Sequence, residues 1–351
     1  MATATRANYR LGTLYAVATA GLMAVQSPFS SLAAKSLSAP IFVCFTQIAL
    51  LASVPLLICR PDSRREFFGV LFDFRNIGKL AALVLIGSVG LLLYNVGLSG
   101  ANPIITAGIM NLSPFWAALV AFAVCRKALP TSPLVFGGCF IVAFIGAMTI
   151  AFSQLDPTNS NMTSSGFSVG EILRNRWIYA IPMPIFFALS GTLIFKWFPD
   201  TDESAVIAAN FLVSTVVLIP TTLLIAKLGH TSPMNDRPEM AILLLLVGTL
   251  ASSAAGRVFY QVALSATRND NGFVTMFLLI VPGIASLICY PLSWWVPELR
   301  VVSSPMFFIG LSLVTIPLAV FSLKSSSGGV QVDIPRTQSG EGPVPSAAVL
   351  P

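Results

Sequence analysis

The chain has 351 residues, of which 55% are hydrophobic and only 10% are charged. A soluble domain carries about 25% charged residues, so this composition excludes an ordinary soluble domain and indicates an integral membrane protein. The formal net charge is +6. Because the basic residues stand between apolar segments, we interpret them as topology signals and expect no nucleic-acid partner.

The charge-free stretches are long enough to span a bilayer. Lys79 and Arg126, for example, enclose 46 residues without a charge, which is room for two spans of about 20 residues each. In chain order we predict ten transmembrane helices, over residues 11–30, 40–59, 79–98, 104–125, 133–153, 177–198, 204–226, 239–265, 272–296 and 303–323.

The segments between and beyond these helices are polar. We expect a short lead over 1–10, a charged loop over 60–79, a linker between two halves over 154–176 and a disordered tail over 324–351. Ten spans put both termini on one side of the membrane. Lys and Arg are in excess on that side, which predicts cytoplasmic termini.

A weak internal repeat relates the two halves. The segment 94–99, YNVGLS, aligns with the segment 260–265, YQVALS, at an offset of 166 residues. Two five-helix copies, over 11–153 and 177–323, must have opposite orientations because five is odd. The sequence therefore predicts an all-α membrane protein of ten transmembrane helices in two inverted five-helix repeats, with a site near the midplane between them.

Arg257 is the one ionisable residue that we expect deep inside a span. A charge there is costly, so its side chain should face protein or a wet cavity. One interpretation is an anchor for a substrate carboxylate or phosphate, because a guanidinium binds either in a bidentate manner. The alternative is a structural arginine bonded to carbonyls of a neighbouring helix. The other candidate substrate-binding residues are polar or aromatic: Tyr260, Gln261, Tyr94, Asn95, Asn111, Trp116, Gln26 and Phe277.

Several chemistries have no support in the sequence. No Asp or Glu is expected in the middle of a span, and there is no phosphate-binding loop of the GxxxxGK[ST] type. A single histidine and five cysteines without paired spacing give no catalytic set, metal cluster or disulfide framework. We therefore expect no enzyme activity, no cofactor and no metal.

Two passages resemble a known family. The text YNVGLSGANPIITAGIMNLSPFWAALVAFAV, followed by PLVFGGCFIVAFIGAMTIAFS and the weaker second copy, resembles the drug/metabolite transporter superfamily of the EamA type. The resemblance implies a central cavity lined mainly by the first, third, fourth, sixth, eighth and ninth helices, with alternating access. Gln47 and Arg126 depart from the family pattern, which often has Arg and Glu in those regions.

These observations lead us to expect a transporter of the bacterial inner membrane. Its substrate would be a small polar metabolite, amino-acid-like or carboxylate-bearing, moved by export or exchange. The chain would work as a monomer, with the lipid bilayer as its other partner. Two alternatives stay open: a receptor or assembly subunit on the same scaffold, and an exporter of apolar or cationic compounds.

Overall fold

The computed structural model describes residues 9–99, 103–126, 129, 131–154, 176–228, 238–266, 277, 280–294, 296 and 299–327, and over these ranges it is helical without a strand. The helices are α1 (Tyr9–Ser36), α2 (Ala39–Leu57), α3 (Pro61–Phe72), α4 (Phe74–Ser99), α5 (Pro103–Met110), α6 (Ser113–Cys125), α7 (Pro133–Ser153), η1 (Arg176–Ala180), α9 (Met183–Trp197), α10 (Glu203–Leu228), α11 (Pro238–Leu250), η2 (Ala251–Gly256), α12 (Arg257–Ala266), α14 (Val281–Leu292) and α15 (Pro305–Ser327).

Seven helical stretches within the described ranges are long and apolar enough to cross a membrane. They comprise α2, α4, α5 with α6, α7, η1 with α9, α10, and α11 with its continuation to Tyr260. Two shorter apolar helices, Val281–Leu292 and Pro305–Phe321, follow them. The prediction of an all-helical membrane protein is confirmed, whereas the ten spans and the inverted repeat stay predictions.

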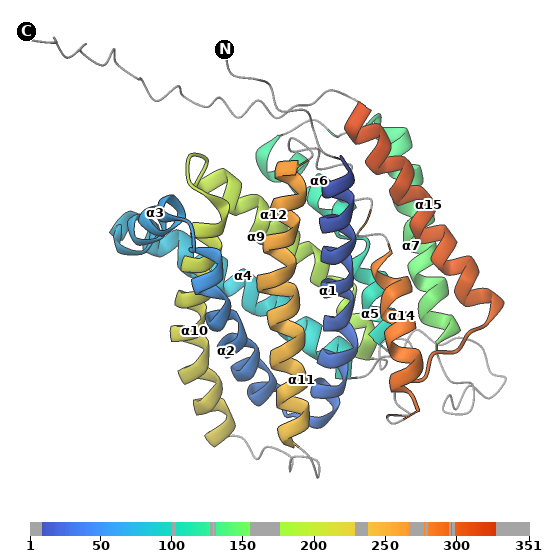
Figure 1. Ribbon diagram of the computed structural model, residues 1–351, viewed down its shortest axis with the longest axis horizontal. Coiled ribbons are helices and arrows are strands. Elements are labelled where there is room, and N and C mark those ends of the chain that lie inside the picture. Colours follow the sequence, from blue (N-terminus) through green and yellow to red (C-terminus); the bar gives the residue numbers. More distant parts are fainter. Residues whose placement is uncertain are drawn as a thin grey trace, which may run out of the picture.

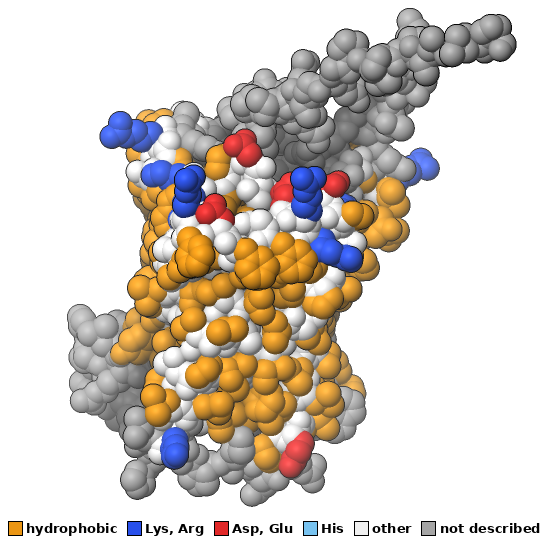
Figure 2. All heavy atoms as spheres, turned by 90° about the vertical axis from the view of Figure 1, so that its left-hand side faces the viewer, with side chains coloured by type: hydrophobic (Ala, Val, Ile, Leu, Met, Phe, Trp, Pro, Cys, Tyr) orange, Lys and Arg blue, Asp and Glu red, His pale blue; other side chains and the backbone are white. Residues whose placement is uncertain are grey.

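Charged side chains gather at one end of the molecule, above a band of apolar side chains (Figure 2). This end, which carries α3, is called the charged end below. The exposed charged residues on α3 and its flanks are Arg60, Asp62, Arg64, Arg65, Asp73 and Arg75. The helix α1 begins at the charged end, and α11 begins at the other end (Figure 1).

The prediction of a charged loop over 60–79 is wrong, because this segment forms α3 and the start of α4. Pro61 occupies the first turn of α3, where its fixed φ favours a helix. The helix is amphipathic: Ser63, Phe67 and Val70 are buried at spacings of four and three residues, while its other face carries the exposed Arg64 and Arg65. Burial of that face stabilises a helix that charge content alone did not suggest.

Three of the predicted helices are interrupted. Residues 104–125 form α5 and α6, separated by a turn at Asn111 and Leu112. Pro114 explains this break, since proline lacks the N–H that would continue the helical hydrogen bonds and its ring clashes with the preceding turn. Residues 177–198 likewise form η1 and α9 around Pro182. Residues 239–265 change to a π-helix, η2, just before Arg257.

The two halves are interleaved through pairs of helices. In the described structure α2 contacts α10, α7 contacts α15, α1 contacts α11, α12 and α14, and α9 contacts α4 and α6. Gly146 allows a close approach: a Cβ added there would lie 2.7 Å from the Val314 backbone nitrogen. Ser214 of α10 donates a hydrogen bond to the Gln47 amide oxygen of α2 at 2.9 Å. Small residues and buried polar pairs of this kind are common between membrane helices.

Candidate functional site

Arg257 forms an ion pair with Glu203, the first residue of α10. The Arg257 Nη1 and Glu203 Oε1 atoms are 3.7 Å apart, and the side chains are 41% and 43% exposed, respectively. Arg257 lies in the last turn of the apolar stretch Pro238–Tyr260, so it stands near the charged end of the bundle. Its carboxylate partner is therefore within the chain, and the pair is accessible from outside the core.

The start of α10 is fixed in place by α3. The Ser63 hydroxyl donates a hydrogen bond to Asp202 Oδ2 at 2.6 Å, and the Asp202 backbone N–H donates to Glu66 Oε2. A carboxylate at a helix N-terminus also interacts favourably with the helix dipole. These contacts hold Glu203 at the position where it meets Arg257.

Tyr260 lies beside this ion pair, and Phe277 packs against the same small core as Tyr260. Tyr260 is close enough to Glu203 and Arg257 to interact electrostatically with both. Both aromatic side chains pack with Tyr15 around a small core of α1 and α12 residues. Of the predicted site residues, the structure thus brings Arg257 and Tyr260 together, and it places Tyr260 and Phe277 around one small core at the first half of α1. The Gln261 side chain lies outside the described part.

Tyr94 lies against the second half of α1, and the next residue on α4, Asn95, is also buried. Tyr94 is 7% exposed and stands beside Ser27 and Ser30 of α1. Asn95 is 3% exposed. Gln26 is half-buried on the same part of α1. The equivalent positions Tyr94 and Tyr260 therefore flank opposite halves of α1, and the predicted residues do not form a single cluster.

Several buried polar atoms without a partner lie on α1 and on helices that contact it. Ser31, Asn95, Thr106 and Thr249 each bury a side-chain polar atom with no hydrogen-bond partner among the described residues. They come from α1, α4, α5 and α11, and α1 contacts the other three helices. A buried polar group left unpaired costs about 1–3 kcal/mol. Each such atom calls for an explanation, because buried polar groups in folded proteins are normally paired.

Asn111 and Trp116 lie elsewhere. Asn111 is in the turn between α5 and α6, where its backbone N–H donates to the Ala107 carbonyl at 3.1 Å. Trp116 packs edge-on against Phe140 of α7, with ring centroids 5.1 Å apart. Phe140 belongs to a cluster of aromatic rings that joins α6, α7 and α15. The structure gives Trp116 a packing role and does not bring it near Arg257.

Sequence reasoning missed Glu203 as the partner of Arg257. A usable signal existed, since the predicted topology puts the start of the helix over 204–226 and the end of the helix over 239–265 on the same side. It also missed the π-helix η2. Such π-turns are frequent at functional sites because they shift the register of the residues that follow.

Taken together, the fold and the site define an all-helical membrane protein with an accessible ion pair near one end and an unpaired polar interior along α1. The described residues contain no group of three His, Cys, Asp or Glu side chains able to hold a metal ion. No protein-family model matches the sequence, and a search of curated proteins gave no significant match.

Proposed function

We propose that this protein is a membrane transporter of ten transmembrane helices in two inverted repeats. The observation that carries the proposal is the symmetry of its helix contacts. At the offset of the sequence repeat, α1 corresponds to α9, α2 to α10, α4 to α11 and α12, α6 to α14, and α7 to α15. If each helix is replaced by its equivalent in the other half, the contacts of α1 with α12 and α14 become contacts of α9 with α4 and α6. These contacts are also present. The same replacement leaves the pair α2 with α10 and the pair α7 with α15 unchanged, and both pairs are in contact.

Such a symmetry supports alternating access. Two inverted halves with one sequence pattern can exchange conformations, so that a site between them opens first to one side and then to the other. Tyr94 and Tyr260, which the repeat makes equivalent, flank opposite halves of α1. Under this proposal α1 contacts helices of both halves, and the substrate passes along it.

The preferred substrate is a small polar metabolite that bears a carboxylate. Arg257 offers the guanidinium, and its present partner Glu203 is 3.7 Å away and 43% exposed. Ion pairs with this exposure contribute only about 0–1 kcal/mol, so a substrate carboxylate can replace Glu203 at little cost. The unpaired polar atoms along α1 would bind the rest of a polar substrate.

A second candidate has support from the same pair. An exporter of cationic compounds needs an acid in its path, and Glu203 is an accessible carboxylate beside the aromatic ring of Tyr260. Cations bind favourably to such rings. The two candidates differ in which partner of the ion pair contacts the substrate, so mutation of each partner separates them.

The test is uptake into proteoliposomes with a panel of amino acids, organic anions and organic cations. The carboxylate proposal expects Arg257→Ala to abolish uptake of the anionic substrate while the protein remains folded and inserted, and Arg257→Lys to retain part of it. If Arg257→Ala transports at the wild-type rate, Arg257 is not the anchor. Saturable binding with no uptake of any compound would instead favour a receptor.

A further inference from the structure

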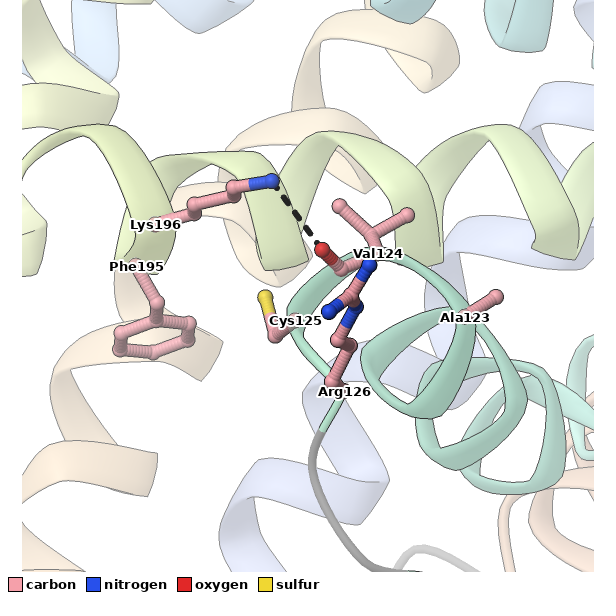
Figure 3. A pocket seen from close by; sticks show the side chains of 6 residues that line it. All are labelled: Ala123, Val124, Cys125, Arg126, Phe195 and Lys196. Carbon is pink, nitrogen blue, oxygen red and sulfur yellow. Dashed lines mark hydrogen bonds between the residues drawn. The ribbon is translucent and has the colours of Figure 1, made fainter.

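A pocket at the junction of α6 and α9 is lined by two cations. It has a volume of about 640 Å³, and its lining residues are Ala123, Val124, Cys125, Arg126, Phe195 and Lys196. We call it the basic pocket. In Figure 3 the Lys196 and Arg126 side chains approach the last turn of α6 from different sides, and the Cys125 thiol lies between Phe195 and Arg126. No carboxylate is among the described residues that line it.

Lys196 is already held in place. Its Nζ donates a hydrogen bond to the Val124 carbonyl at 3.0 Å (Figure 3). A lysine that binds the last carbonyls of a helix is a common way to satisfy a helix C-terminus. This contact accounts for one cation, and it leaves further N–H donors of the ammonium available.

The same explanation does not cover Arg126. Within the described residues it is the one non-glycine residue with positive φ, at 54°. This left-handed position after a helix is usually taken by glycine, because a side chain there is strained. The Arg126 backbone N–H donates to the Ala121 carbonyl, so the helix end needs only the backbone. The exposed guanidinium adds nothing to that cap, and strain retained at such a residue suggests a function for its side chain.

The pocket lies where an apolar surface meets the charged end. Lys79, at the start of α4, donates to the carbonyl of Trp197, the residue after Lys196. On the apolar side, the Phe195 ring lines the pocket and is 56% exposed. An anionic head beside Arg126 and Lys196 would thus have its apolar tail against this ring. A free phosphate would use the cations but not the ring.

We infer that the basic pocket binds the phosphate-bearing head of an anionic phospholipid. Arginine binds phosphate oxygens in a bidentate manner and lysine adds a point charge. Basic pockets between transmembrane helices are suited to such heads at the membrane surface. The site is separate from the Arg257–Glu203 pair, so the inference does not depend on the proposed function.

The test is native mass spectrometry of the full-length protein in detergent, with phosphatidylglycerol or phosphatidylcholine added. The wild type should bind phosphatidylglycerol in preference. Each lost cation should weaken that binding about fivefold, and the pair Arg126→Gly with Lys196→Gln about 25-fold, with phosphatidylcholine unaffected. Arg126→Gly removes the strained backbone as well as the charge, and Lys196→Gln keeps a donor for Val124, so both variants should fold.

Arg75→Gln is the matched control, because it removes an exposed cation at the same end but outside the pocket. The inference is overturned if this control weakens phosphatidylglycerol binding as much as the pocket variants do. It is also overturned if the wild type does not distinguish the two lipids. A third arm adds millimolar inorganic phosphate: if phosphate displaces the lipid from the wild type, the pocket is a free-anion site. Should the double variant not fold, Arg126→Gly alone decides the question.

Discussion

Neutralising Glu203 should make Arg257 more available to an anionic substrate. The atoms Arg257 Nη1 and Glu203 Oε1 are 3.7 Å apart, and both side chains are about two-fifths exposed. An exposed pair of this kind contributes about 0.2–1 kcal/mol. If the substrate carboxylate must replace Glu203, Glu203→Gln should lower the KM for that substrate by a factor of about 1.4 to 5, since 1.4 kcal/mol corresponds to tenfold.

The assay is initial-rate uptake into proteoliposomes across a range of substrate concentrations. Glu239→Gln is the matched control: Glu239 is also in the first turn of a helix, α11, but it is exposed at the other end of the molecule. Both substitutions remove the same interaction with a helix dipole, so their difference isolates the contact with Arg257. An increase in KM for an anion, or a loss of cation transport, would refute the carboxylate account and favour Glu203 as the substrate contact.

Three further predictions concern the interior and the helix contacts. Asn95→Leu should leave the melting temperature unchanged or raise it, because an unpaired buried amide nitrogen costs about 1–3 kcal/mol. Uptake by this variant should fall at least about tenfold. Intact uptake would show that Asn95 is not part of the site. Gly146→Ala should lower the free energy of unfolding by about 1–3 kcal/mol, since its Cβ would stand 2.7 Å from the Val314 backbone nitrogen. Gly137→Ala should not lower it, because a Cβ there would meet open space. Equal melting temperatures for the two variants would contradict the contact between α7 and α15. Trp116→Phe should keep uptake within about twofold of the wild type, because Trp116 packs on Phe140 away from Arg257; a large change in substrate preference would place it in the site after all.

Helix positions could be predicted well where an apolar run ends at a clear boundary. The helix predicted over 133–153 is found as α7, Pro133–Ser153. Pro133 supplies a favourable first residue, and Gln154 after the last turn bonds to the loop before α15, through Nε2 to the Val302 carbonyl at 2.9 Å. Composition and local rules suffice for such an element, because its neighbours only add to what the sequence already favours.

Elements that depend on packing were not predictable in this way. The helix α3 reads as a charged loop, and only its contacts with Asp202 and the burial of Phe67 and Val70 show why it is helical. The π-helix before Arg257 has no local signal of the kind that Pro114 gives for the break between α5 and α6. A sequence pattern shows which face of a segment is apolar, but it does not show which neighbouring surface will cover that face.

The candidate site was predicted in its residue types and missed in its arrangement. Arg257 stands out in the sequence as the one charge within a span, but its pairing with Glu203 joins two helices 54 positions apart in the chain. The repeat linked Tyr94 with Tyr260, and the structure places them against opposite halves of α1. The proposed inverted repeat would account for this arrangement, because equivalent residues of oppositely oriented halves lie toward opposite faces of the membrane.

Counterflow distinguishes transport by alternating access from binding and from leakage. Proteoliposomes loaded with an unlabelled compound are diluted into a trace of the same compound carrying a label, so that a carrier exchanges one for the other. The account predicts a transient, saturable accumulation of label for at least one carboxylate-bearing metabolite, lost in Arg257→Ala and kept in Glu239→Gln. Transport by alternating access would be contradicted if the label, for every compound tested, only equilibrated across the membrane at a rate independent of the unlabelled compound inside.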